Sequence, residues 1–148
     1  MDELDLRIRN HLYASFVRDG TAASTAEAAE ALDLPAAHVA DAYRRLHDAH
    51  ALVLQPNGTE IRMLNPFSVV ETSNRVEAGG RSWFANCAWD ALGIPAALHS
   101  DGRIESACPD CGEPLELEVR EGELVRGREL LVHFVVPARR WWDDIVFT

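Results

Sequence analysis

The stretch that decides how the second half of this chain folds is SWFANCAWDALGIP, residues 82–95. Ser82 is a favourable N-cap residue, and the pattern that follows it predicts a helix over residues 83–92. Gly93 and Pro95 are typical of a helix end, so we expect the helix to stop there. The predicted helix therefore holds a thiol and a carboxyl at a defined spacing.

Cys87 and Asp90 are three residues apart, and positions three apart on a helix share a face. Trp83 and Asn86 are expected beside them. A thiol next to a carboxyl can bind a soft metal and transfer a proton. The carboxylate alone raises the pKa of the thiol, so an activated thiolate needs help from elsewhere. The alternative is that Cys87 packs as a small hydrophobe while Asp90 lies on a solvated edge.

A second thiol pair, Cys108 and Cys111, forms a C-x-x-C motif that we call the knuckle. Such a knuckle often supplies half of a zinc site, and zinc at Cys108 and Cys111 is one prediction. A closed site needs four ligands, and Cys87, His99 or His133 would complete it only if the fold brings them close. The alternatives are a redox pair, an auxiliary thiol pair, a vestigial site and two ordinary surface cysteines; no thioredoxin-like βαβ pattern surrounds the motif.

Before Asn65-Pro66 the apolar spacing predicts three helices followed by a two-stranded hairpin. These elements are helices over residues 2–19, 25–32 and 35–49, strands over 51–54 and 60–64, and a turn at Pro56-Asn57-Gly58. Three helices and a hairpin are typical of a winged helix. We therefore predict a winged-helix-like domain over residues 1–65.

After Pro66 the pattern changes to strands and turns around the helix that bears Cys87. The predicted elements are an extended segment 66–76, a turn at Gly79-Gly80, a strand 115–119, a turn at Glu121-Gly122, an apolar strand 130–136, and a strand that starts at Asp144 and runs to Thr148. The predicted fold class is α+β. The winged-helix-like unit is expected to pack on a C-terminal mixed β-sheet, residues 66–148, that carries the catalytic helix.

Charge and composition exclude several classes of function. The 148 residues carry a net charge of −10, and residues 1–65 hold six Arg against ten Asp and Glu, a net of −4. A nucleic-acid partner is therefore disfavoured, and a structural or partner-docking role is favoured for the first domain. No apolar run approaches about 18 residues, so no membrane span is expected. An odd count of three Cys and no signal-peptide pattern favour a cytoplasmic protein with reduced thiols.

The segment CAWDALGIPA, residues 87–96, resembles the active-site helix of the alkylmercury (organomercurial) lyase family. In that family a Cys-x-x-Asp pair is followed by an apolar turn and a Pro-Ala step. A winged-helix-like unit precedes the catalytic region there, as residues 1–65 do here. The segments 65–67 and 81–85 are also similar to family members. The resemblance thus extends over most of the chain.

The resemblance implies protonolysis of the carbon–mercury bond of a small organomercurial, without a cofactor, to give mercuric ion and a hydrocarbon. Cys87 would capture mercury, and Asp90 would take the thiol proton and deliver it to the departing carbon. Mercury is a soft ion that prefers thiolate to oxygen, and the leaving carbon needs a nearby acid. The mercuric ion would pass to cytosolic thiols and then to a mercuric reductase.

The family's second catalytic Cys would fall just past Thr148 by this alignment, so we expect either that the natural chain continues or that it lacks this thiol. Cys108 sits where the family has a further, non-essential Cys, whereas Cys111 is not general in the family. Two other hypotheses remain open. One is a non-catalytic soft-metal protein that binds mercury or zinc through Cys87, Cys108 and Cys111. The other is a winged-helix, metal-responsive regulator.

Overall fold

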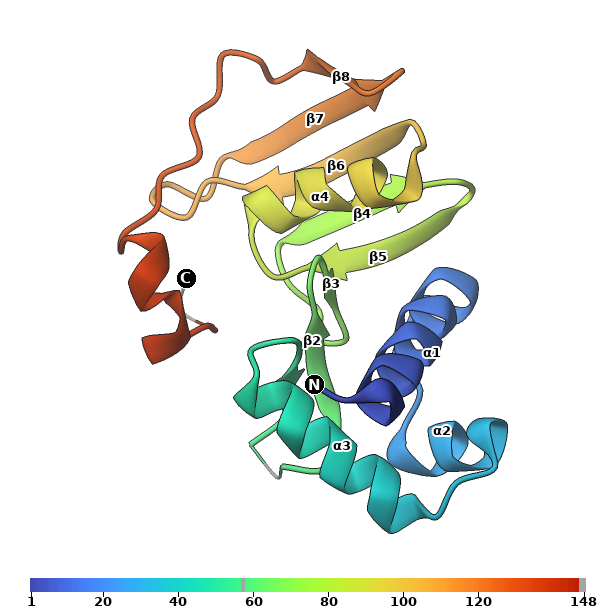
Figure 1. Cartoon of the computed structure of the whole chain (residues 1–148). Coiled ribbons are helices and arrows are strands. Elements are labelled where there is room, and N and C mark those ends of the chain that lie inside the picture. Colours follow the sequence, from blue (N-terminus) through green and yellow to red (C-terminus); the bar gives the residue numbers. More distant parts are fainter. Residues whose placement is uncertain (57, 147–148) are drawn as a thin grey trace. The chain divides into compact units, whose positions relative to one another are not determined.

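The structure is a computed structural model that describes residues 1–56 and 58–146. The chain divides into two compact units, Met1–Val70 and Glu71–Thr148, which are described separately (Figure 1). Asn65-Pro66, where the sequence pattern changes, lies inside the first unit. Its cis peptide bond forms part of the turn between two paired strands.

The described residues of the first unit form three helices and three short antiparallel strands. They are α1 (Glu3–Asp19), α2 (Thr25–Leu32), α3 (Ala36–Asp48), β1 (Val53–Leu54), β2 (Ile61–Leu64) and β3 (Phe67–Ser68). The strands pair in the order β1-β2-β3. The predicted helices and hairpin strands are thus present close to their predicted bounds. Asn57, in the predicted hairpin turn, lies outside the described residues.

Local signals in the sequence explain where these helices begin and end. At the start of α1, the Asp2 carboxylate accepts the Asp5 N–H at 2.8 Å, while the Asp5 carboxylate accepts the Asp2 N–H at 3.2 Å. Ser24 begins α2 with an equivalent capping box. Gly20 ends α1 with φ of 80°, which glycine adopts without steric cost. Asp5 also accepts hydrogen bonds from Arg45 and so ties α1 to α3.

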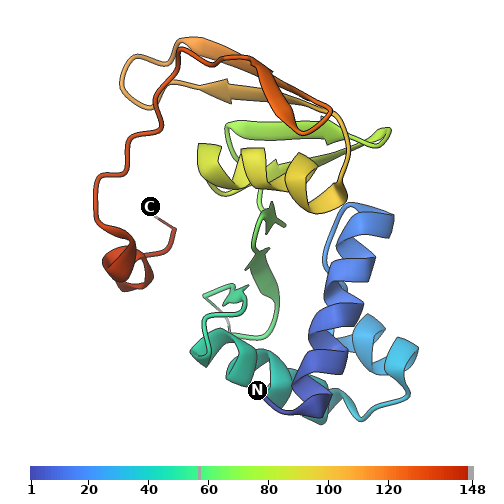
Figure 2. The same cartoon turned by 45° about the horizontal axis from the view of Figure 1, so that its top comes forward.

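The second unit is an antiparallel sheet with one helix against it (Figure 2). Its elements are β4 (Asn74–Ala78), β5 (Arg81–Ala85), α4 (Ala88–Leu98), β6 (Gly102–Ala107), β7 (Pro114–Arg120), β8 (Glu123–Arg126) and the 3-10 helix η1 (Ala138–Asp143). The strand order within this unit is β5-β4-β6-β7-β8.

Every described strand pair in this unit is antiparallel, so the predicted mixed sheet is wrong. The reason lies in the connections. Two-residue turns join β4 to β5 and β7 to β8, and a six-residue connection joins β6 to β7. Such hairpins make antiparallel neighbours. The helical connection through α4 leads from β5 to β6, which run in the same direction but are separated by β4.

The helix predicted over residues 83–92 is displaced along the chain. Residues 81–85 form β5, which pairs with β4, and its side chains at Trp83 and Ala85 are buried. The helix α4 begins only after Cys87. The helix also continues through Pro95 to Leu98. Pro95 is buried and packs closely on Gly102, so tertiary packing compensates for its missing N–H.

Two predicted C-terminal strands are also absent from the described residues. The segment 130–136 is not part of any strand, and it leaves Leu131 94% and Val135 70% exposed. Apolar, β-branched residues favour a strand only where a neighbouring strand takes up the backbone hydrogen bonds. Residues 144–146 form a bend and turn, and Phe147 and Thr148 lie outside the described residues.

Candidate functional site

The N-terminal end of α4 brings Cys87 and Asp90 together. Cys87 is the N-cap residue, with φ −142° and ψ 175°, and its carbonyl oxygen accepts the Ala91 N–H at 2.9 Å. Asp90 is the third residue of the helix. The Cys87 thiol donates to Asp90 Oδ2 across an Sγ–O distance of 3.5 Å. Trp83 lies in β5 and Asn86 lies before the helix, so neither shares the helical face on which they were predicted.

Burial dominates the electrostatics of this pair. Desolvation raises the pKa of the Asp90 carboxyl above its ordinary value of 3.8, and the hydrogen bond with Cys87 opposes that rise. Desolvation also raises the pKa of the Cys87 thiol, and the Asp90 charge adds to the effect, while the backbone N–H groups of Asp90 and Trp89 oppose it. Both groups therefore hold a proton more strongly than they would in water. The arrangement suits transfer of one proton between sulfur and oxygen.

Aromatic side chains from the C-terminal segment lie next to the start of α4. The ring of Phe134 lies edge-on to Trp89 at a centroid distance of 6.2 Å and contacts Trp141 at 5.0 Å. The Asn86 amide donates to the Ile145 carbonyl at 3.2 Å. We call Trp89, Phe134 and Trp141 the aromatic cluster. The sequence pattern placed Phe134 in a strand over residues 130–136, so this aromatic neighbourhood was not predicted.

Comparison with known proteins gives the family of this site. The profile of the family described as alkylmercury lyase matches residues 67–148, more than half of the chain. The chain belongs to the alkylmercury lyase family. The matched region contains both Cys87 and Asp90. The resemblance predicted from residues 87–96 is therefore confirmed at the level of the family.

A solved structure extends this relationship. The crystal structure of the mercury-bound form of MerB2 superposes with a TM-score of 0.69 and 28% sequence identity. The alignment covers 85% of this chain and 60% of that chain, so this alkylmercury lyase family member spans less than two thirds of the solved relative. A search among curated proteins gave no match. The likeness confirms the α+β fold class.

The knuckle lies in the connection from β6 to β7 of this family member. The Cys108 N–H donates to the Glu113 carbonyl and the Gly112 N–H to the Cys108 carbonyl, both at 2.9 Å. Cys108 is half-buried and Cys111 is exposed. Within residues 1–56 and 58–146, no group of three or more His, Cys, Asp and Glu side chains is placed to hold a metal ion. The structure thus does not gather Cys87 with the knuckle, and it gives no support for zinc.

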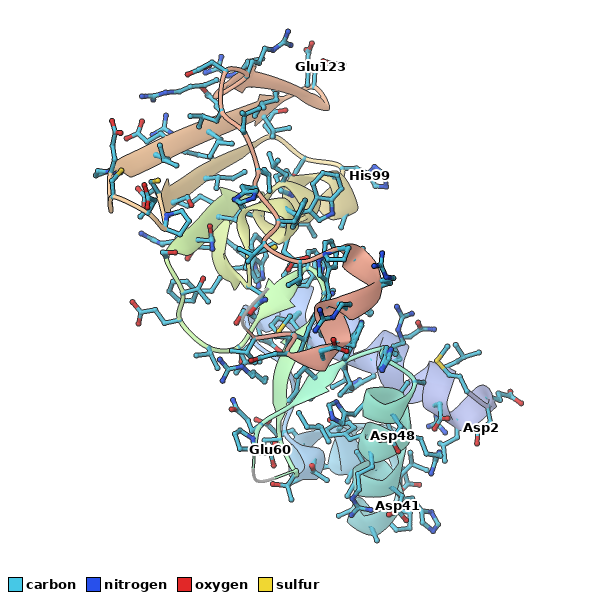
Figure 3. The ribbon with its side chains drawn as sticks, turned by 90° about the vertical axis from the view of Figure 1, so that its left-hand side faces the viewer. Asp2, Asp41, Asp48, Glu60, His99 and Glu123 are labelled. Atoms are coloured by element: carbon cyan, nitrogen blue, oxygen red, sulfur yellow. The ribbon has the colours of Figure 1, made fainter. Side chains whose placement is uncertain are left out.

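The two histidines considered as zinc ligands lie elsewhere. His99 caps the C-terminal end of α4, whereas Cys87 lies at its N-terminal end (Figure 3). A helix of eleven residues separates these ends by about 16 Å at about 1.5 Å per residue. His133 is exposed in the C-terminal segment. Neither side chain adds a ligand to the knuckle in the described part of the chain.

The exposed side chains of α3 include both carboxylates and guanidinium groups. Asp41 and Asp48 are exposed on this helix (Figure 3), and Arg44 pairs with Asp41. Arg45 donates to the buried Asp5 at 2.6 Å. Both cations of the helix are therefore matched by carboxylates, which is a poor surface for phosphate. None of the described helices is long and apolar enough to cross a bilayer.

Proposed function

We propose that this alkylmercury lyase family member cleaves the carbon–mercury bond of small organomercurials by protonolysis. The observation that carries the proposal is the 3.5 Å contact between Cys87 Sγ and Asp90 Oδ2 at the start of α4. Sulfur is the ligand that mercury prefers, and the adjacent carboxyl can relay the proton that the leaving carbon needs. No cofactor takes part, and mercury is substrate and product.

The reaction balances with the Cys87 thiol as the source of the proton. The sulfur of Cys87 bonds to mercury in R–Hg–SR′, and its proton passes to the Asp90 carboxylate. Asp90 then delivers that proton to carbon as the electron pair of the carbon–mercury bond becomes the new C–H bond. The products are the hydrocarbon R–H and a mercuric ion held between Cys87 and the thiolate R′S⁻.

The second sulfur is assigned to a small thiol from solution. Two sulfurs on mercury increase the electron density at the metal and so weaken its bond to carbon. A further free thiol then exchanges with Cys87 and removes the mercuric ion. We place this chemistry in the cytoplasm, where thiols stay reduced, with a mercuric reductase as the consumer of the ion.

The aromatic cluster is proposed to contact the organic group of the substrate. Trp89 stands between Cys87 and Asp90 in sequence and is 58% exposed, and Phe134 contacts it from the C-terminal segment. An apolar organic group gains from such a surface, because its apolar area leaves water. The first unit is proposed to be a winged-helix-like domain, residues 1–65, with a structural or partner-docking role.

The test is hydrocarbon release from a simple organomercurial in the presence of excess small thiol, measured by gas chromatography. The wild-type chain is expected to release one hydrocarbon per substrate consumed, and Cys87→Ser is expected to release none above the thiol-only blank. Cys111→Ser, which alters an exposed thiol, is the matched control and should retain activity. Equal rates for wild type and the blank would overturn the proposal.

A further inference from the structure

The knuckle is organised around the sulfur of Cys108. The backbone N–H groups of Cys111 and Asp110 and the side chain of Cys111 lower the pKa of the Cys108 thiol. The turn is closed by the Gly112 N–H on the Cys108 carbonyl, with Gly112 at φ +75°, a conformation that favours glycine. Cys108 and Cys111 therefore lie in one turn, closed by backbone hydrogen bonds, whose ends are fixed by the pairing of β6 with β7.

These contacts prepare Cys108 to act as a metal ligand. A thiolate is the metal-binding form of cysteine, and N–H donors stabilise its negative charge. They lower the pKa of the Cys108 thiol, and the nearby Asp110 opposes this only in part. This is the reverse of the situation at Cys87, whose pKa is raised by burial.

We propose that Cys108 and Cys111 form a second soft-metal site, which binds one Hg²⁺ as a two-coordinate dithiolate without Cys87. Two thiolates neutralise a divalent ion, and Hg²⁺ is satisfied by two sulfurs, so no further ligand is required. Tetrahedral zinc needs four ligands, and the described residues supply no third side chain from the His, Cys, Asp and Glu set. The coordination number thus selects mercury over zinc at the knuckle.

Access to the site differs from access to Cys87. Cys111 is exposed, so an ion carried by two small thiolates can reach it by ligand exchange. Each Hg–S bond formed to a knuckle cysteine replaces one to the carrier, and the cysteine proton passes to the departing thiolate. The connection from β6 to β7 lies at the same end of the second unit as the start of α4 (Figures 1 and 2). If the proposed lyase function holds, the knuckle can take up the inorganic product, but binding itself does not depend on that function.

The experiment titrates the reduced full chain with HgCl₂ in the Cys87→Ser background, which isolates the knuckle. Binding is read from Hg–S charge-transfer absorption and from the mass of the intact complex, with a monothiol as competitor. One Hg²⁺ per monomer is expected. Adding Cys108→Ser or Cys111→Ser should reduce retention at least about 100-fold, because the second sulfur then binds only from solution.

Three outcomes would overturn the proposal. One is Hg²⁺ retention in Cys87→Ser no better than in the Cys87→Ser/Cys111→Ser double variant. Another is a complex in which one Hg²⁺ bridges two chains. The third is binding of Zn²⁺ that resists displacement by Hg²⁺. Hydrocarbon release is measured separately on the wild-type chain, so failure of the lyase proposal and failure of this one give different results. Circular dichroism of each variant checks that the fold is retained.

Discussion

Replacing Asp90 with Asn removes the proposed proton relay while leaving the thiol in place. Asn has the shape of Asp, and residue 90 is fixed as the third residue of α4, so the side-chain amide is expected near Cys87 Sγ, where the carboxylate lies at 3.5 Å. The amide can accept or donate a hydrogen bond, but it cannot pass on a proton at neutral pH. Mercury capture by Cys87 should therefore persist while hydrocarbon release is lost.

The expected loss follows from the role of the carboxyl. A positioned general acid or base contributes about 10²–10⁴-fold to the rate. This corresponds to about 3–5 kcal/mol of activation free energy, at about 1.4 kcal/mol per factor of ten. We therefore expect the single-turnover rate of hydrocarbon release by Asp90→Asn to fall at least about 100-fold.

Stability supplies an independent check on the same variant. Burial raises the folded-state pKa of Asp90 above 3.8, so the folded state binds more protons than the unfolded state between those two values. Wild-type stability is then lost as pH rises through this window. Asp90→Asn should be more stable than wild type at pH 7, and the difference should shrink below pH 3.8. Urea unfolding at the two pH values measures it.

Two results would refute this reasoning. Hydrocarbon release by Asp90→Asn within about twofold of wild type would remove Asp90 from the mechanism, because a relay contributes far more than that. A variant that is folded but no longer captures mercury would show that the carboxylate, and not Cys87 alone, holds the metal. Capture is measured by the mass of the protein after incubation with the organomercurial, before hydrocarbon appears.

Three further predictions concern the supporting structure. Asp5→Asn should cost about 1–3 kcal/mol in urea unfolding at pH 7, since it weakens charge-assisted hydrogen bonds to Arg45. The pKa of Asp5 is lowered, so wild type should lose this advantage as pH falls below 3.8. Gly102→Ala should destabilise by about 1–3 kcal/mol, because the new Cβ would lie 2.7 Å from Pro95 Cγ. Phe134→Ala should raise KM for an aryl substrate about 3–10-fold, with little change for a methyl one.

The first unit could be predicted from sequence because its signals are local. Asp2 and Ser24 begin helices with capping boxes, and Gly20 ends α1, so each helix is bounded by residues within one turn of its end. The strand β7 of the second unit could be predicted in the same way, because buried Leu117 and Val119 alternate with charged residues. None of these assignments depends on contacts with distant parts of the chain.

The second unit was harder because distant contacts decide its elements. The run from Trp83 onward is apolar without a clear period, which does not distinguish a strand from a helix. Pairing with β4 makes residues 81–85 a strand, and the fit of Pro95 against Gly102 carries α4 past a residue that usually ends helices. The segment 130–136 has the composition of a strand but is not assigned to a strand in the described structure.

The candidate site was predictable in spite of the misplaced helix. A spacing of three residues joins side chains inside a helix, and it also joins an N-cap residue to the third residue of the helix, as in a capping box. Cys87 and Asp90 have the second relationship, so they are adjacent although Cys87 is outside α4. The aromatic cluster could not be predicted in this way, because it depends on where the C-terminal segment passes.

The groups that surround the sulfur differ between Cys87 and the knuckle, and so the two sites are expected to differ in their chemistry. Cys87 contacts the half-buried carboxyl of Asp90, whose pKa is raised by desolvation, and this pair is proposed to deliver a proton to carbon. At Cys108 the backbone N–H groups of Cys111 and Asp110 instead lower the pKa of the thiol, which favours the thiolate that binds metals. The knuckle is therefore proposed to bind a soft ion without a hydrogen-bonded thiol–carboxyl pair of the kind that Cys87 and Asp90 form. An organomercurial bound only at the knuckle should keep its carbon–mercury bond, whereas inorganic Hg²⁺ should be retained there. Incubating Cys87→Ser with each compound distinguishes these outcomes, and hydrocarbon release by that variant would show that the adjacent carboxyl is not what makes a thiol site catalytic.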